Sequence, residues 1–215
     1  DRSPSRGLGD VYKRQDGDAT DVGDLTVTRS QTSGQSSSTN GYTAGGTTLP
    51  GYVRSNVIDK FAFATSNDAT DHGDMIAVKS SCAGQSDGTH GYASGGLFTN
   101  TPSNTFVNTI DKFAYASNVT SSDHGDISVA RHIAAGHSSE THGFVSNGDS
   151  GNLSNVTDKF AFASNTTAAD HGDLTEASMH VAGQSSTTDG FCTGGWTSSA
   201  VNKIDKFAFS SNTSG

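Results

Sequence analysis

The chain has 215 residues, of which 13 are Lys or Arg and 22 are Asp or Glu, so its net charge is −9. An acidic surface repels phosphate backbones and anionic lipid, so we expect no nucleic-acid partner. No apolar run approaches the ~18 residues of a membrane-spanning helix, so we expect no membrane insertion.

The first fifteen residues differ from the rest of the chain. From Asp16 onward every stretch has a later counterpart, whereas residues 1–15 have none. The segment from Gly7 to Gln15 matches the translation of a transposase adapter used in preparing sequencing libraries. We therefore expect residues 1–15 to lie outside the fold, and the native part to be a fragment of a longer gene, cut within a repeat at the start and also at Gly215. The alternative is a genuine basic tail that binds nucleic acid.

Three phrases each occur four times between Asp16 and Gly215. In the first copy they are "DATDVGDL" from Asp18, "GQSSSTNGYTAGG" from Gly34 and "IDKFAF" from Ile58. Self-similarity at a fixed period is the signature of a repeat architecture, so we predict four repeats of about 47–52 residues each. Their approximate boundaries are 16–66, 67–118, 119–165 and 166–215.

The apolar content leaves two interpretations open. Leu, Ile, Val and Phe number 6, 6, 13 and 11 of 215 residues, below the ~20% level at which disorder becomes an alternative. Phe and Tyr nevertheless recur at fixed positions in every copy, which a solvated linker has no physical reason to maintain. We therefore expect a folded array whose neighbouring repeats share a core, with Cys82 and Cys192 as small buried side chains.

The second copy illustrates the strands that we expect in each repeat. The sequence "CAGQS" at 82–86 predicts a first strand, and the Asp-Gly pair that follows predicts a hairpin turn. The second strand is "HGYASGG" at 90–96 and the third is "NTIDKFAYA" at 108–116. A turn over 117–126 then leads to a fourth strand, "ISVA" at 127–130. Four short antiparallel strands per unit are typical of a propeller blade.

The order of these segments resembles the kelch repeat. A strand of small residues, a Gly-Tyr or Gly-Phe strand that ends in a Gly pair, and an apolar–Asp–aromatic strand follow one another across residues 16–215. The wording of "IDKFAFAS" and "ATDHGDL" is similar to kelch-like proteins encoded by tailed bacteriophages. The third copy departs from the pattern with Asn147-Gly148, and Phe stands where kelch units usually carry Trp. The resemblance implies an all-β, kelch-like β-propeller with further blades in the parent protein.

The resemblance also implies a function. It indicates a non-enzymatic binding or structural module, a phage virion protein of the tail or fibre that contributes to host-surface or glycan recognition. Its partners would be a glycan or protein receptor on a cell surface, or other virion proteins, and its location the virion or the extracellular space. The alternative is a secreted cellular propeller that binds carbohydrate or protein. We expect no enzyme and no cofactor, because the sequence offers no asymmetric set of nucleophile, base and orienting group.

The recurrent acidic positions have two interpretations. The "DHGD" phrase could form a calcium loop or a zinc cluster, but Val22 replaces its His in the first copy. We expect instead that its Gly adopts a positive φ and that its Asp side chains bond turn amides, without a metal. The Asp of each "DKF" phrase is expected to pin its strand and to pair with the Lys that follows it. These residues are Asp59, Asp111, Asp158 and Asp205.

One position on the first strand is a candidate for an axial site. In a propeller the first strands surround a central axis, so equivalent residues of successive repeats should form a ring that lines the channel. The alternative is that these side chains bond the backbone of neighbouring strands. The residues are Gln35, Gln85, His137 and Gln184.

Length variation is confined to one loop per repeat. From the Asp of "GD" to the second residue of the Gly pair the distance is always 22, and from the Asp of "DKF" to the next "GD" Asp it is always 15. The interval between them varies as 13, 15, 10 and 10. Equivalent loops of a propeller emerge on one face, so we expect ligand binding there, through aromatic side chains outside the repeated pattern. The alternative is that these aromatics only cover the sheet ends. They are Tyr52, Phe98, Phe106 and Trp196.

Overall fold

Short antiparallel strands account for all the regular structure of this chain. The computed structural model describes residues 19–100 and 103–211, and in these residues it contains strands and turns but no helix. The predicted all-β class is therefore confirmed. The predictions for residues 1–15 lie outside the described residues.

Each repeat builds one antiparallel meander, which we call its main sheet. In strand order, main sheet 1 comprises β2 (Ser33–Ser36), β3 (Asn40–Ala44), β6 (Val57–Ala62) and β7 (Thr70–Asp74). Main sheet 2 comprises β9 (Ala83–Ser86), β10 (His90–Ser94), β13 (Thr109–Ala114) and β14 (Ser122–Asp126). Main sheet 3 comprises β15 (Ala135–Ser138), β16 (His142–Ser146), β17 (Val156–Ala161) and β18 (Ala169–Asp173). Main sheet 4 comprises β19 (Ala182–Ser185), β20 (Asp189–Thr193) and β21 (Ile204–Ala208).

The fourth strand is not the one predicted from the sequence. The phrase "SDHGD" forms strand β14, whereas residues 127–130 belong to no strand. Each fourth strand follows the expected repeat boundary, so a main sheet draws its outermost strand from the next segment. The glycine does adopt a positive φ, 106° at Gly73, and the Asp71 carboxylate accepts a 2.8 Å hydrogen bond from the Gly73 amide. Both features occur at a β-bulge, where the register between β6 and β7 shifts, and not in a turn.

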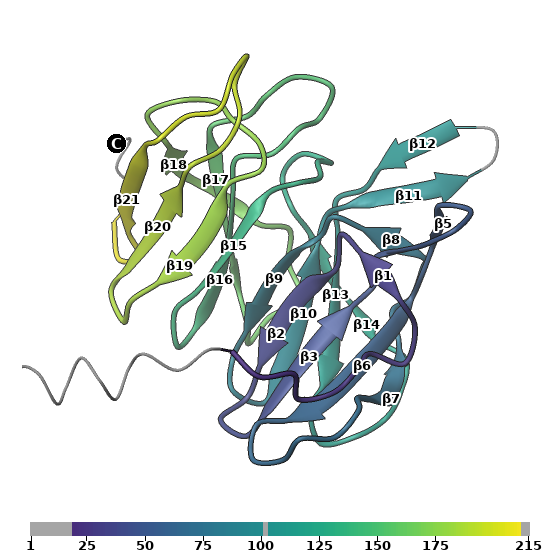
Figure 1. Ribbon diagram of the computed structural model, residues 1–215. Coiled ribbons are helices and arrows are strands. Elements are labelled where there is room, and N and C mark those ends of the chain that lie inside the picture. The colour runs from purple at the N-terminus through teal and green to yellow at the C-terminus, as the bar shows by residue number, and fades with distance from the viewer. Residues whose placement is uncertain (1–18, 101–102, 212–215) are drawn as a thin grey trace, which may run out of the picture.

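The variable loops form a second set of small sheets, which we call the minor sheets. The first comprises β1 (Arg29–Ser30), β4 (Thr47–Thr48) and β5 (Val53–Arg54), and the second β8 (Lys79–Ser80), β11 (Leu97–Asn100) and β12 (Ser103–Phe106). In the third and fourth repeats single bridges take their place, such as that between His132 and Asp149. Figure 1 shows β11 and β12 projecting beyond the ends of the main sheets.

The hydrophobic core lies between successive main sheets. In main sheets 1 to 3 the aromatic residue of the second strand stacks on the last aromatic residue of the next repeat's "DKF" phrase. Tyr42 stacks on Tyr115 with ring centroids 4.2 Å apart, and Phe144 stacks on Phe209 at 4.6 Å. Each pair belongs to a separate buried cluster that joins two neighbouring sheets. Single repeats thus lack a core of their own and fold by packing on their neighbours.

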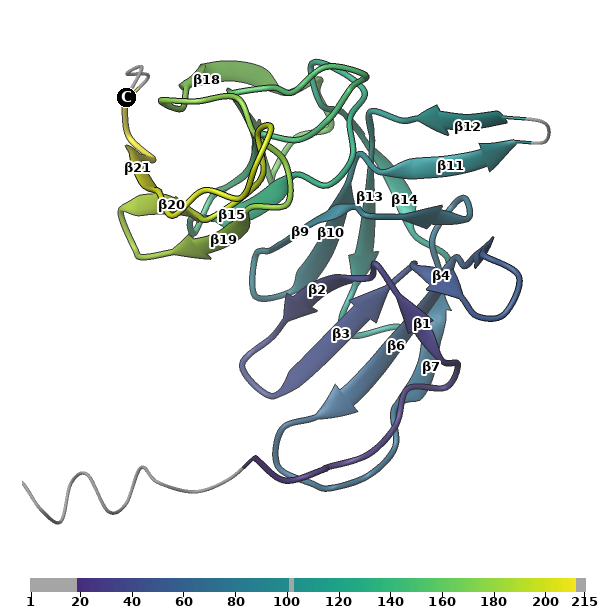
Figure 2. The same ribbon diagram turned by 45° about the horizontal axis from the view of Figure 1, so that its top comes forward.

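The first strands of the main sheets approach one another most closely. Strands β2, β9, β15 and β19 lie side by side in the middle of the array (Figure 2). A Cβ atom at Gly183 would lie 2.6 Å from the carbonyl oxygen of Gly136. In the second, third and fourth repeats a side chain at this position would not fit between the strands, which accounts for the glycine there.

Candidate functional site

A ladder of backbone hydrogen bonds links the repeats just before their first strands. The Ser81 amide donates to the Gln31 carbonyl at 2.8 Å, and the Ile133 amide donates to the Ser81 carbonyl at 3.0 Å. The His180 amide in turn donates to the Ile133 carbonyl at 3.3 Å. These four residues, one from each repeat, form what we call the linking ladder.

The linking ladder holds an unusual backbone conformation. Gln31, Ser81, Ile133 and His180 have φ values of 57°, 57°, 55° and 58°, in the left-handed region. This region is costly for residues with a side chain, and most of all for a β-branched one such as Ile133. Its presence in all four repeats indicates that the bonds between neighbours outweigh the local cost.

A cavity of about 270 Å³ lies at the linking ladder. Its walls are the residue pairs 31–32, 81–82, 133–134 and 180–181, one from each repeat. It therefore presents amide, hydroxyl and imidazole groups beside aliphatic side chains. Burial raises the pKa of the Cys82 thiol to about 11, so this side chain is not a thiolate nucleophile at neutral pH.

The variable loops lie at the same end of the sheets as this cavity. Each minor sheet pairs a variable loop with residues directly before the linking ladder, as Ser30 pairs with Thr47. The Thr47 hydroxyl also lies 3.2 Å from the side-chain oxygen of Gln31. The cavity and the variable loops of all four repeats therefore form one surface, which we call the loop face.

The four aromatic residues singled out in the sequence all lie on the loop face. Tyr52 is 78% exposed and Trp196 43% exposed, while Phe98 and Phe106 are half-buried. Phe106 stacks on His132 of the next repeat with ring centroids 4.8 Å apart.

The first two variable loops contact each other, and Trp196 of the last loop contacts its own repeat. The Arg54 guanidinium donates to the Asn104 side-chain oxygen at 3.0 Å and so ties the first minor sheet to the second. Trp196 forms its bridges with Met179 and Ala200 inside its own repeat.

The four candidates for an axial ring occupy two different environments. Gln35, Gln85 and His137 are buried between main sheets, and Gln35 donates a 3.0 Å hydrogen bond to the carbonyl of Tyr92 in the next repeat. This geometry agrees with the alternative in which they bond neighbouring backbone. Gln184, on the last main sheet, is exposed. Burial lowers the pKa of His137 to about 4, although its bond to the Gln184 carbonyl acts in the opposite direction.

The recurrent Asp of "DKF" pairs with a different cation from the one expected. Asp59 binds Arg29 at 2.9 Å, Asp158 binds Arg131 at 3.0 Å, and Asp111 binds Lys79. In all three pairs both side chains are buried. The prediction that each Asp pairs with the Lys that follows it is wrong, because that Lys points toward the other side of the strand. Lys112, for example, donates to the Phe162 carbonyl at 3.3 Å.

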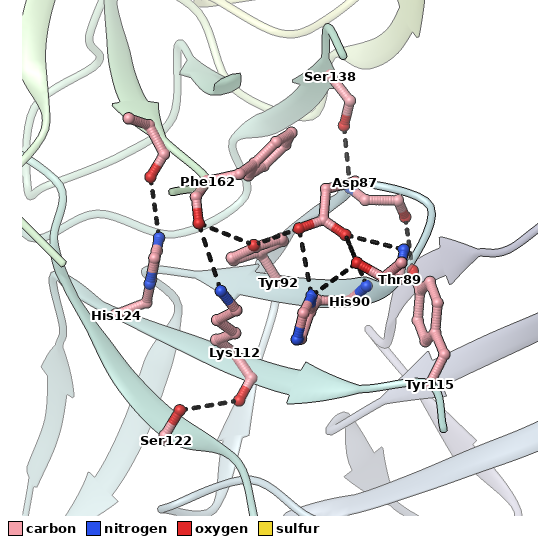
Figure 3. A network of polar contacts seen from close by, with 12 residues as sticks. Asp87, Thr89, His90, Tyr92, Lys112, Tyr115, Ser122, His124, Ser138 and Phe162 are labelled. Carbon is pink, nitrogen blue, oxygen red and sulfur yellow. Dashed lines mark hydrogen bonds and ion pairs between the residues drawn. The ribbon is translucent and has the colours of Figure 1, made fainter. Parts of the chain in front are cut away.

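A polar network surrounds Asp87 in the hairpin of the second main sheet. The Tyr92 hydroxyl donates to the Asp87 carboxylate at 2.7 Å, and the amides of Thr89 and His90 donate at 2.9 and 2.7 Å (Figure 3). Burial raises the pKa of Asp87, but these hydrogen bonds outweigh it and hold the pKa at about 2. At the equivalent position Ser37 accepts a 3.0 Å bond from the Asn40 amide. The network therefore closes the hairpin turn.

The described residues contain no helix long and apolar enough to cross a membrane. Nor does the described part of the chain gather three or more His, Cys, Asp or Glu side chains in a group that could hold a metal ion. A scan against protein-family models finds no match, and a search of curated proteins finds none.

The amino-acid sequence alone does not reveal the linking ladder. Its residue types differ in every repeat, so no motif marks it. The signal was one of spacing, because each member lies seven residues after the last Asp of "GD". Only the backbone hydrogen bonds between repeats show that this position joins neighbouring repeats.

Proposed function

We propose that this chain is a non-enzymatic, kelch-like β-propeller segment that recognises a ligand through its loop face. The observation that carries the proposal is that four loops, which differ in residue type and have three different lengths, lie at the same end of the sheets as a cavity to which every repeat contributes. A rigid repeated scaffold that presents variable loops at one end is a common design of binding proteins. The four-stranded meanders packed through their glycine-containing first strands support the propeller assignment.

The chemistry of the loop face suits a glycan or a protein receptor. Tyr52 and Trp196 offer exposed rings that can stack on a sugar or anchor a partner. The cavity adds hydrogen-bonding groups beside aliphatic surface, a combination typical of ligand sites. Together with the resemblance to proteins of tailed bacteriophages, these features favour a virion protein that contributes to host-surface recognition. A secreted cellular propeller with the same binding role is the alternative.

A loss-of-binding experiment tests the proposal. The triple variant Tyr52→Ala, Phe98→Ala, Trp196→Ala is compared with the parent chain on a glycan array and on a panel of bacterial cells. We expect binding to be lost while the thermal unfolding midpoint stays nearly unchanged. Val119→Ala is the matched control, because Val119 is 53% exposed in a loop at the opposite end of the sheets. Full binding by the triple variant would place the function elsewhere.

A further inference from the structure

The two ends of the array expose complementary halves of the interface that joins the repeats. Main sheets 1 and 4 lie at opposite ends of the array in both ribbon views (Figures 1 and 2). Within the chain the same interface occurs three times, between sheets 1 and 2, 2 and 3, and 3 and 4. It is heterologous, because the surface that one sheet contributes differs from the surface contributed by the next.

The aromatic half-sites at the two ends are a matched pair. On sheets 2, 3 and 4 the last aromatic residue of the "DKF" phrase is buried against the preceding sheet, as Tyr115 is at 7% exposure. Its equivalent on sheet 1, Phe63, is 56% exposed. At the other end Phe191 occupies the position of Tyr42, Tyr92 and Phe144, yet none of the ring stacks found among the described residues involves Phe191.

The strand edges are complementary as well. In the described residues main sheet 4 has three strands, and its edge strand β21 lacks the "DHGD" partner that completes the other main sheets. Residues 19–24 carry that phrase as "DVGD" but belong to no strand. Among the described residues, sheet 4 therefore has no fourth strand, while residues 19–24 carry the phrase that forms this strand in the other main sheets.

Residues 19–24 already lie where a fourth strand belongs. The carbonyl of Asp24 accepts a 2.8 Å hydrogen bond from the Ala69 amide. The equivalent bonds from Ser121 to Asp74 and from Ala168 to Asp126 are both 2.7 Å and involve true fourth strands. The segment is therefore positioned against sheet 1, and no third strand pairs with its other edge in the part of the chain that the structure describes.

We infer that a second copy of this chain docks its sheet 1 and residues 19–24 onto sheet 4 and the β21 edge of the first. In this arrangement Phe191 stacks on Phe63 of the second copy, and β21 gains an antiparallel partner strand. In main sheet 1, Asp59 of β6 lies opposite Asp71 of β7. The same register would place Asp205 of β21 opposite Asp21 of the second copy.

One opposite-charge pair favours the same register, whereas Asp205 and Asp21 would bring two carboxylates opposite each other, as Asp59 and Asp71 do within the chain. Val57 lies opposite Asp74 in main sheet 1. At the equivalent positions of the proposed interface, Lys203 would lie opposite Asp24 of the second copy. Lys203 is the only cation at its position among the four repeats. It binds Glu176 of its own repeat at 2.8 Å and would in addition face the Asp24 carboxylate of the second copy. Opposite charges directly across an antiparallel pair are favourable.

Molar mass in solution tests the inference. The full chain has a mass of 22.1 kDa, and we expect sedimentation equilibrium to show association into multiples of it as concentration rises. Phe63→Asp and Phe191→Asp disrupt opposite halves of the interface, so each variant alone should remain monomeric. An equal mixture of the two should associate again, because each variant keeps the half that the other lacks. Val119→Asp is the control at an exposed site outside the interface and should associate like the parent.

A second variant keeps the inference testable if Phe191→Asp does not fold. A Cβ atom at Gly34 meets nothing within 4 Å, whereas one at Gly183 would contact the carbonyl of the preceding repeat. Gly34→Ala should therefore fold normally and weaken association at least tenfold.

Two results would overturn the inference. One is a parent chain that stays monomeric at all soluble concentrations, as expected if the edges are completed only by further repeats of a longer chain. The other is an associating parent whose two Asp variants fail to complement each other. Neither result depends on ligand binding by the loop face, so this inference and the proposed function stand or fall separately.

Discussion

Arg131 and Asp158 form an ion pair in the interior of the third repeat, with Nη1 and Oδ2 3.0 Å apart and side-chain exposures of 1% and 0%. Asp158 lies on the third strand of its sheet, while Arg131 comes from the segment directly before the linking ladder. The Arg131 guanidinium also donates to the Val145 carbonyl at 2.9 Å on the second strand. The pair therefore joins the linking ladder to the middle of the main sheet.

Breaking this pair should destabilise the protein strongly. Asp158→Ala leaves a buried guanidinium without its counter-ion, which typically costs about 3–5 kcal/mol in the free energy of unfolding. The fourth repeat supplies the control, because Ser178 stands at the position of Arg131 and Asp205 accepts a 2.7 Å bond from the Thr175 hydroxyl instead. Asp205→Ala should cost about 1 kcal/mol. Urea denaturation measures both, and equal effects would show that the charge pair is unimportant.

Stability should depend on pH through His137. Its pKa in the folded protein is about 4, below the value of about 6.5 for an unperturbed His. Since the unfolded chain binds the proton more tightly, stability is fully present above pH 6.5 and falls as the pH drops toward 4. The loss should reach about 3 kcal/mol.

The other repeats indicate the control for this pH dependence. Gln occupies the same position in the other three repeats, so His137→Gln should fold and show a smaller pH dependence between pH 6.5 and 4. Burial also lowers the pKa of His124, so part of the dependence remains. An unchanged slope in the variant would assign the titration to other groups.

Both cysteines should be inert in the native protein. Burial raises the pKa of Cys82 to about 11 and that of Cys192 to about 12. Because the thiolate is the reactive form, alkylation at pH 8 should be at least about a hundredfold slower than in urea, where the pKa returns to about 8.5. Time-resolved mass spectrometry of iodoacetamide labelling measures both rates. Rapid labelling of Cys82 in the native state would mean that its side chain is accessible from the cavity.

Asp87 should be replaceable by Ser but not by Ala. Ser closes the equivalent hairpins of the other three repeats, and its hydroxyl accepts the turn amides as Ser139 does for His142 at 3.0 Å. We expect Asp87→Ser to change the free energy of unfolding by less than about 1 kcal/mol and Asp87→Ala to cost about 2 kcal/mol, from the loss of several hydrogen bonds. Thermal unfolding of the two variants checks this order, and the reverse order would contradict the capping role.

Much of the fold follows from the sequence alone. The four-fold recurrence of the phrases determines the number of units, and the short alternating stretches determine that they are β-strands. The fixed aromatic positions determine where the core lies, because large rings at constant spacing must pack against equivalent neighbours. The confinement of length variation to one loop per repeat likewise marks the part of each unit that the scaffold leaves free.

Other features were decided only by the tertiary structure. "DHGD" has the composition of a turn, yet it forms a strand, because a register shift accommodates its Gly and the carbonyl of Ala114 on the next sheet holds His72 at 2.9 Å. Asp158 pairs with Arg131 rather than with the adjacent Lys159, because alternate residues of a strand point to opposite faces. The linking ladder is invisible in the residue types, since backbone atoms form it. Each of these features depends on contacts between segments distant in the chain, which local sequence patterns do not encode.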